Sequence, residues 1–197
     1  MTPTVRFATH DDVSDLSLAL ARAFSDDPIW LWLYPQGDRT RRLRPMFDAL
    51  LRTGIDRGAT VLTDDERRGA AIWQRSTERS LGARGKLRMA SAMARGGADI
   101  RRGMQMLGAV EKRHPKAPHL YLALLGTDPA AQGTGVGSAL VREVLDAPDN
   151  AVEAAYLETE TEANVAFYWR FGFEVVDEVD VGSDGPHLWF LWRDPTG

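Results

Sequence analysis

The stretch that decides the fold reads Gln132-Gly133-Thr134-Gly135-Val136-Gly137-Ser138. It lies between an apolar segment typical of a strand, residues 120–125, and a segment with helical character, residues 139–145. Glycines at alternate positions leave the backbone bare where the helix begins, so the first amide N–H groups of that helix are open to a ligand. Together with the positive end of the helix dipole, these groups form a seat for a phosphate or pyrophosphate.

The spacing of the glycines separates three kinds of phosphate-binding loop. A P-loop requires a lysine after its last glycine, and no lysine follows Gly137. A dinucleotide-binding loop requires Gly-x-Gly-x-x-Gly, which no frame of this stretch satisfies. The pattern Gln-x-x-Gly-x-Gly, formed by Gln132, Gly135 and Gly137, does fit. It resembles the acetyl-CoA pyrophosphate motif of the GCN5-related N-acetyltransferases (GNAT). Taken alone, the motif leaves a glycine-rich turn without a ligand as the alternative.

The segments around the motif extend the resemblance. Pro129 ends the strand before the motif, because proline cannot continue a ladder, and residues 156–159 have the character of a second strand. A short helix follows, for which we predict Asn164 as the N-cap and Gly172 as the terminator. The order of these segments over residues 119–192 is similar to the acetyltransferase core, whose closing helix ends in Tyr-x-x-x-Gly-Phe.

Parts of the chain also resemble puromycin N-acetyltransferase and its relatives. They are residues 4–13, 118–137, 157–159 and 164–173. The match is weak over residues 26–112, which in this superfamily largely shape the acceptor site. The resemblance therefore implies acetyl transfer from acetyl-CoA to an amine and leaves the identity of the amine open.

Length and composition fit one globular domain over residues 1–197. The chain is 44% hydrophobic and carries a formal net charge of -4, which gives no basic footprint for nucleic acid. It has no apolar run long enough for a membrane span and no signal-peptide pattern, so we expect a cytoplasmic protein, either a monomer or a homodimer.

The sequence contains no cysteine. An acyl-cysteine intermediate is therefore impossible, and acetyl transfer would pass directly from thioester to amine in a ternary complex. The histidines are scattered without metal-ligand spacing, so we expect no metal site.

The predicted fold is α/β (α+β): a twisted, mixed and mostly antiparallel sheet with helices on both faces. The strands near residues 120 and 156 form a parallel pair, which in the GNAT fold splays apart around the pantetheine arm. Other predicted strands are residues 5–8, 59–63, 69–74, 173–181 and 187–192, and predicted helices are residues 11–24 and 41–57. Residues 29–35 form an aromatic patch to which we assign no regular structure.

Residues 76–114 differ from the rest of the chain. They are rich in Arg, Ala, Met and Gly, and they read as two helices broken near Gly96 and Gly97. We expect this helical insertion before the central strand to form a wall of the acceptor site. Its apolar positions, expected in the core, are Leu81, Leu87, Met89, Met93, Ile100, Met104, Met106 and Leu107.

The resemblance implies roles for individual residues. The predicted cofactor-binding residues are Leu125, Gly126, Thr127, Gln132, Gly133, Thr134, Gly135, Val136, Gly137, Ser138 and Asn164. Tyr168 is the candidate general acid beside the coenzyme sulfur, with a core aromatic as the alternative. Glu158 is the leading candidate to orient or deprotonate the amine. His119 is a rival base, and Glu160 and Glu162 are expected in a solvated connection.

Aromatic residues are the candidates for binding the acceptor. They are Trp30, Trp32 and Tyr34, with Trp73 behind them. A flat aromatic wall suits an aromatic or cationic amine, and we expect one or two of these side chains to face the cleft and the others to be core. The favoured function is N-acetylation of a small-molecule amine. The alternatives are acetylation of a protein or peptide amine, and an acetyl-CoA-binding regulator without catalysis.

Overall fold

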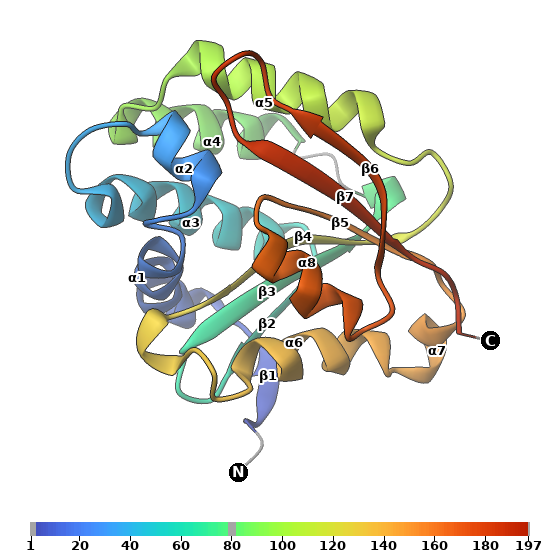
Figure 1. Cartoon of the computed structure of the whole chain (residues 1–197). Helices are drawn as coiled ribbons and strands as arrows, with labels where there is room; N and C mark the ends of the chain where they lie inside the picture. Colours follow the sequence, from blue (N-terminus) through green and yellow to red (C-terminus); the bar gives the residue numbers. More distant parts are fainter. Residues whose placement is uncertain (1–2, 79–81, 197) are drawn as a thin grey trace.

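The fold is centred on a mixed sheet with strand order β1-β2-β3-β4-β5-β7-β6 (Figure 1). A computed structural model describes residues 3–78 and 82–196. The strands are β1 Val5–Phe7, β2 Thr60–Asp64, β3 Gly69–Arg75, β4 Leu120–Thr127, β5 Ala155–Thr159, β6 Glu174–Asp180 and β7 His187–Arg193. Neighbouring strands are antiparallel except β4 and β5, which are parallel. The predicted fold class and the predicted parallel pair are confirmed.

Helices cover both faces of this sheet (Figure 1). They are α1 Val13–Ala23, α2 Pro28–Leu33, α3 Arg39–Asp56, α4 Gly82–Gly96, α5 Ile100–Arg113, α6 Val136–Leu145, α7 Pro148–Ala151 and α8 Glu162–Trp169. Successive side chains of β3 point to opposite faces of the sheet and pack against different layers of helices. Ala70 and Ile72 pack with α1, α2 and α3, whereas Ala71 and Trp73 pack with α6 and α8.

The parallel pair separates soon after it forms. Pairing between β4 and β5 covers only Leu120 with Ala155 and Tyr121 with Tyr156, although β4 continues to Thr127. On its other side β4 stays paired with β3, with a bulge opposite the Ile72/Trp73 step. The β5-facing edge of the later β4 residues is therefore left without a strand neighbour, as the predicted splay requires.

One local prediction needs correction, and one helix was not predicted. The aromatic patch at residues 29–35, for which we made no structural prediction, largely forms helix α2, whose start is stabilised by the Asp27 carboxylate accepting the Ile29 and Trp30 N–H groups. The N-cap of α8 is Thr161, whose hydroxyl accepts the Asn164 N–H, so Asn164 lies inside the helix instead of capping it. Gly172 follows α8 with φ +82°, as expected of a terminator.

The insertion forms two helices, α4 and α5, as predicted, but the expectation that its apolar residues are core is wrong for several of them. Leu87, Ile100, Met104 and Leu107 are exposed, and no residue of α5 is fully buried. Leu81 lies outside the described residues. The pair forms an outer layer (Figure 1), and the Arg102 guanidinium holds α5 in place by donating to the Trp32 carbonyl at 2.8 Å.

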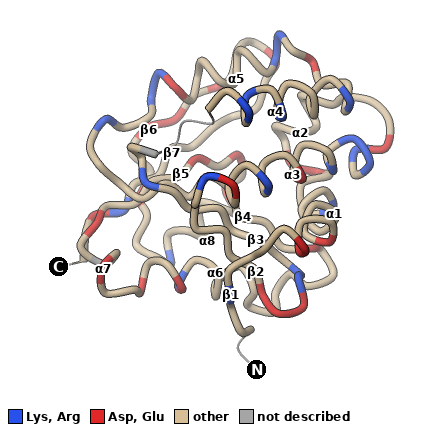
Figure 2. Tube along the Cα trace, turned by 180° about the vertical axis from the view of Figure 1, so that it is seen from behind, with Lys and Arg blue, Asp and Glu red and all other residues tan. Residues whose placement is uncertain are grey.

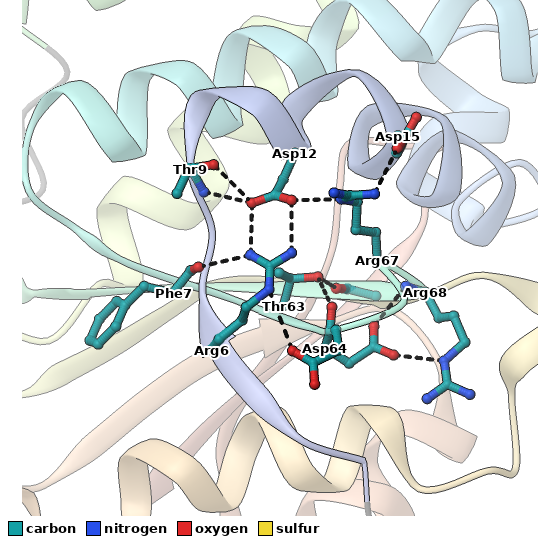
Figure 3. Close-up of polar contacts among 11 residues, drawn as sticks. Arg6, Phe7, Thr9, Asp12, Asp15, Thr63, Asp64, Arg67 and Arg68 are labelled. Carbon is teal, nitrogen blue, oxygen red and sulfur yellow. Dashed lines mark hydrogen bonds and ion pairs between the residues drawn. The ribbon is translucent and has the colours of Figure 1, made fainter.

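A buried carboxylate ties the first strand to the rest of the fold. Asp12, 2% exposed, accepts hydrogen bonds from both Arg6 terminal nitrogens at 2.8 Å and from Arg67 Nε at 2.7 Å (Figure 3). The Thr9 N–H donates to the same carboxylate at 2.8 Å. These bonds join β1, the start of α1 and the β2–β3 turn.

Charged residues of both signs are interspersed along the trace (Figure 2). Within residues 3–78 and 82–196, no helix has the length and apolar character needed to cross a membrane. In the same described part of the chain, His, Asp and Glu side chains form no group suited to hold a metal ion.

Candidate active site

A cleft of about 540 Å³ opens where β4 leaves β5. Its walls are the end of β4, the glycine-rich loop with the start of α6, and α8. The predicted cofactor residues that line it are Leu125, Gly126, Thr127, Gln132, Gly133, Gly135, Val136, Gly137, Ser138 and Asn164. Thr134 is absent from this lining, and its hydroxyl donates instead to the Ala131 carbonyl at 2.6 Å.

Two glycines in the loop are favoured by their backbone conformation, and Gly137 lies at contact distance from the cleft wall. Gly133 and Gly135 have φ +77° and +91°, in the left-handed region that favours glycine, and Gly135 is the N-cap of α6. A Cβ on Gly137 would lie 3.4 Å from the Thr127 hydroxyl and 3.7 Å from the Phe167 ring. The loop therefore brings bare backbone and the N-terminus of α6 to the cleft wall, an arrangement suited to an anion.

A second cavity, of about 250 Å³, adjoins the first. Its walls include Trp30 of α2 and Met106 and Val110 of α5, so the insertion contributes to it. The residues that line both cavities are Phe24, Leu125, Asn164 and Tyr168. A ligand in the cleft and a ligand in the second cavity would thus meet between the end of β4 and α8.

Tyr168 lies at this junction. It is 7% exposed and packs edge-on against the rings of Phe167 and Phe173. Burial, with a smaller contribution from the charge of Glu160, raises the pKa of the Tyr168 phenol above its ordinary value. The hydroxyl is therefore protonated at neutral pH and can donate a hydrogen bond.

Glu158 lines the second cavity and is absent from the lining of the first. Its side chain is 8% exposed. One carboxylate oxygen accepts the Tyr121 hydroxyl at 2.8 Å, and the other lies 3.6 Å from Nδ1 of His114. This buried carboxylate can receive a proton or hold an ammonium group inside the cavity.

Two further carboxyl groups, Glu160 beside Glu158 and Asp27 beside Glu160, were not assigned a role from the sequence. Glu160, expected in a solvated connection, lines the second cavity, where burial and the charges of Asp27 and Glu158 raise its pKa well above the ordinary value. Burial also raises the pKa of Asp27. A cation brought close to these acidic groups would favour their charged forms and offset the cost of their burial. Glu162, the other residue expected in solvent, is exposed at the start of α8.

The aromatic candidates separate into one cavity residue and three core residues. Trp30 lines the second cavity. Trp32, Tyr34 and Trp73 are 8%, 0% and 1% exposed, belong to the two hydrophobic cores and line neither cavity. His119, the rival base, is 1% exposed, lines neither cavity and has Nδ1 2.8 Å from the Ala117 carbonyl.

Comparison with known proteins places this geometry in context. Residues 96–175 match the family model described as acetyltransferase (GNAT) domain, a region that includes the glycine-rich loop, β4 and α8. A Corynebacterium glutamicum structure described as histone acetyltransferase HPA2 and related acetyltransferase is 27% identical, with a TM-score of 0.72 over 100% of this chain and 98% of that one.

More distant structures share the fold. YncA, a putative acetyltransferase from Salmonella typhimurium solved with acetyl-CoA, is 18% identical, with a TM-score of 0.56 over 98% of this chain and 94% of that one. A polyamine N-acetyltransferase from Drosophila melanogaster is 13% identical, with a TM-score of 0.62 over 97% of this chain and 99% of that one.

Proposed function

We propose that this chain, an acetyl-CoA-dependent N-acetyltransferase of the GNAT type, transfers the acetyl group directly to the primary amine of a small molecule. The acceptor would be an aromatic or cationic amine, and puromycin is one compound of this class. We also propose that residues 1–197 act as a single catalytic domain in which α4 and α5 complete the acceptor side.

The observation that carries the proposal is the junction of the two cavities. Phe24, Leu125, Asn164 and Tyr168 belong to both linings, so cofactor and acceptor can be held at one point by a shared wall. Holding two reactants in contact distance removes much of the entropic barrier to a bimolecular transfer. Because the chain has no cysteine, this joint site has to perform the transfer without an acyl-cysteine.

In the first cleft, the loop from Gln132 to Ser138 and the start of α6 would hold the pyrophosphate of acetyl-CoA. The edge of β4 that β5 leaves free, near Leu125, would pair with the pantetheine amides, as a neighbouring strand does elsewhere. Backbone N–H groups at this edge would also stabilise the oxyanion that forms on the thioester carbonyl. Asn164 would add a side-chain contact to the cofactor.

Tyr168 would act on the sulfur of the leaving group. Because burial raises its pKa, full proton transfer to a thiolate is uphill, and a hydrogen bond donated to the developing charge is the favoured form of help. Thiolates leave with little assistance, so we expect Tyr168 to accelerate the reaction without being indispensable.

The second cavity would hold the acceptor. Trp30, Met106 and Val110 supply an apolar wall for the body of the molecule. Glu158 would receive a proton from the ammonium group, and the carboxyl group of Glu160, which lines the same cavity, would favour a cation nearby. A cavity of about 250 Å³ suits a small amine better than a folded protein surface.

A panel of acceptors with mass detection of the product tests the proposal. The panel should contain puromycin, phenethylamine, an aliphatic diamine and a lysine-containing peptide, each incubated with acetyl-CoA. We expect a mass gain of one acetyl group on small amines and none on the peptide. Acetylation of the peptide alone would favour a protein acceptor, and bound acetyl-CoA without any transfer would favour a regulator.

A further inference from the structure

His114 ends the insertion and reaches into the core beside the acceptor cavity. It is the C-cap of α5, and its side chain is only 5% exposed. Its ring lies against those of Tyr121, Tyr156 and His119, with centroids 5.1, 4.9 and 5.0 Å away. The imidazole is thus held in an aromatic box formed by β4, β5 and the residue before β4.

The ring nitrogens of His114 are buried without satisfying their hydrogen-bonding capacity. Neither has a hydrogen-bond partner among the residues that the structure describes. The same holds for Oε1 of Glu158, the oxygen 3.6 Å from Nδ1 of His114. A buried polar group left unpaired costs about 1–3 kcal/mol, so such a pair calls for a functional explanation. Catalytic hydrogen bonds are often long in a free enzyme and shorten when substrate binds.

His114 is absent from the lining of the acceptor cavity. It lines a separate surface hollow of about 380 Å³, together with Ser76, Thr77, Glu111 and Lys116. Glu158 lines the acceptor cavity and is absent from this hollow. The order in space is therefore acceptor cavity, Glu158, His114, surface hollow.

We propose that His114 is a proton relay, which takes the proton that Glu158 removes from the acceptor and releases it to solvent through this hollow. The inference rests on the proposed function. An imidazole suits the task because it can accept a proton at one nitrogen and release one from the other. The proton can then leave toward the hollow while the bound acceptor and acetyl-CoA separate Glu158 from solvent on the cavity side.

The proton balance of the reaction requires such an exit. The acceptor ammonium gives one proton to the Glu158 carboxylate, which passes it to His114 and becomes a carboxylate again. His114 releases a proton to water and returns to its neutral form. The neutral amine then forms the C–N bond, the C–S bond breaks with its electrons on sulfur, and the second amine proton ends on the thiol. The products are the acetylamide, CoA and one proton in solvent.

Glutamine at position 114 provides the first test, because it keeps a polar side chain of similar reach and cannot carry the proton. With the amine that the wild type acetylates best, we expect His114→Gln to lower kcat on the order of 10²-fold, with KM for the amine within about 3-fold. The melting temperature and acetyl-CoA affinity should be retained. His187→Gln, which replaces the first residue of β7, a histidine that lines neither cavity, is the matched control and should keep wild-type kcat.

Chemical rescue separates a relay from a packing role. In His114→Ala, added imidazole and substituted imidazoles of increasing basicity should restore turnover in the order of their pKa values, through the open hollow. Pyrazole, which has nearly the same shape and is a far weaker base, should not restore it. Equal rescue by pyrazole, or a His114→Gln variant with wild-type kcat, would overturn the relay.

The groups that share the surroundings of His114 need separate checks. Glu111 and Lys116 line the hollow, and Glu158 and His119 face the ring. The order of rescue by bases should persist in the background Glu111→Gln, since water in the hollow is the final acceptor. If rescue in the Glu111→Gln background no longer followed the pKa values of the added imidazoles, Glu111 would be the group that carries the proton to solvent. That result would overturn direct release from His114. A wild type that acetylates no amine would instead refute the proposed function.

Discussion

Gly135 combines the two requirements of the loop in one residue, a positive φ and a place beside the N-terminus of α6. We predict that Gly135→Glu abolishes acetyl-CoA binding, with affinity reduced at least on the order of 100-fold, because a carboxylate would occupy the phosphate seat. Isothermal titration calorimetry measures this. Gly135→Ala is the control, since it imposes the same backbone cost of about 1–2 kcal/mol without a charge. Equal affinities of wild type and Gly135→Glu would refute the phosphate site.

Tyr168 provides a prediction about rate. Removing its hydroxyl deletes one hydrogen bond to a developing charge, about 1.5–3 kcal/mol, so Tyr168→Phe should lower kcat roughly 10- to 100-fold. The affinity for acetyl-CoA should change far less, because the ring and its packing against Phe167 and Phe173 remain. Steady-state kinetics with parallel calorimetry separates the two effects. An unchanged kcat would assign Tyr168 to the core alone.

Asp12 provides a prediction about stability and pH. The arginine hydrogen bonds, that of Arg6 above all, hold the pKa of its carboxyl well below the ordinary value, so this stabilisation is present above about pH 4 and is lost as pH falls further. Asp12→Asn should reduce the free energy of unfolding by roughly 2–4 kcal/mol at pH 7 and by less near pH 3.

Urea unfolding at the two pH values checks the Asp12 prediction. Asp15→Asn is the matched control, because Asp15 is 63% exposed and meets Arg67 only at 3.5 Å. A loss that is independent of pH would show that the network acts through packing instead of charge.

At the residue scale, the sequence predicts those parts of the site that depend on local pattern. The stretch from Gln132 to Ser138, identified from its glycine spacing, does line one cleft except for Thr134, because such a loop is specified by local backbone conformation. Trp32, Tyr34 and Trp73 could not be separated from Trp30 in this way, because all four are large apolar aromatics and only tertiary packing decides which one meets a cavity. Glu160 and His114 were missed because tertiary packing forms their surroundings, with Asp27 beside Glu160 and the Tyr156 ring beside His114.

At the scale of elements, the strands and long helices could be predicted from periodicity, whereas helix starts depend on capping chemistry. Asp27 followed by Pro28 is an N-cap with proline at the first helical position, a signal that could have located α2. The residues that follow Pro28 are all apolar, so the 3.6-residue spacing that identifies an amphipathic helix cannot be recognised there. Thr161 and Asn164 are both residue types that favour the N-cap position, and Thr161, three positions earlier, is the one that caps α8.

The packing of α1 on β4 yields a prediction at this scale. A Cβ on Gly126 would lie 2.7 Å from both Leu20 Cδ2 and Phe24 Cε2, so Gly126→Ala requires these packed side chains to shift. We expect it to reduce the free energy of unfolding by about 1–3 kcal/mol. Gly108→Ala, in α5, meets no atom within 4 Å and should be neutral or stabilising. Chemical unfolding of both variants gives the answer, and equal stabilities would contradict the close packing.

At the scale of the whole molecule, the two helical layers have different tasks. Only the cleft proposed for the cofactor is lined by α6, and only the cavity proposed for the acceptor is lined by α2 and α5, whereas Asn164 and Tyr168 of α8 line both. The sequence predicts the insertion as two helices whose apolar positions we expected in the core. It could not reveal how much of their apolar surface is covered, because the hydrophobic period marks a face and says nothing of what packs against it.

Release of free CoA thiol by the wild-type protein, followed with a thiol reagent in the presence of acetyl-CoA and the amine panel, tests the central claim most directly. The chain has no cysteine, so every thiol detected is product. We predict release that depends on a small amine and equals the acetylamide formed, over a low background without amine. Bound acetyl-CoA with no amine-dependent release across the panel would contradict the account.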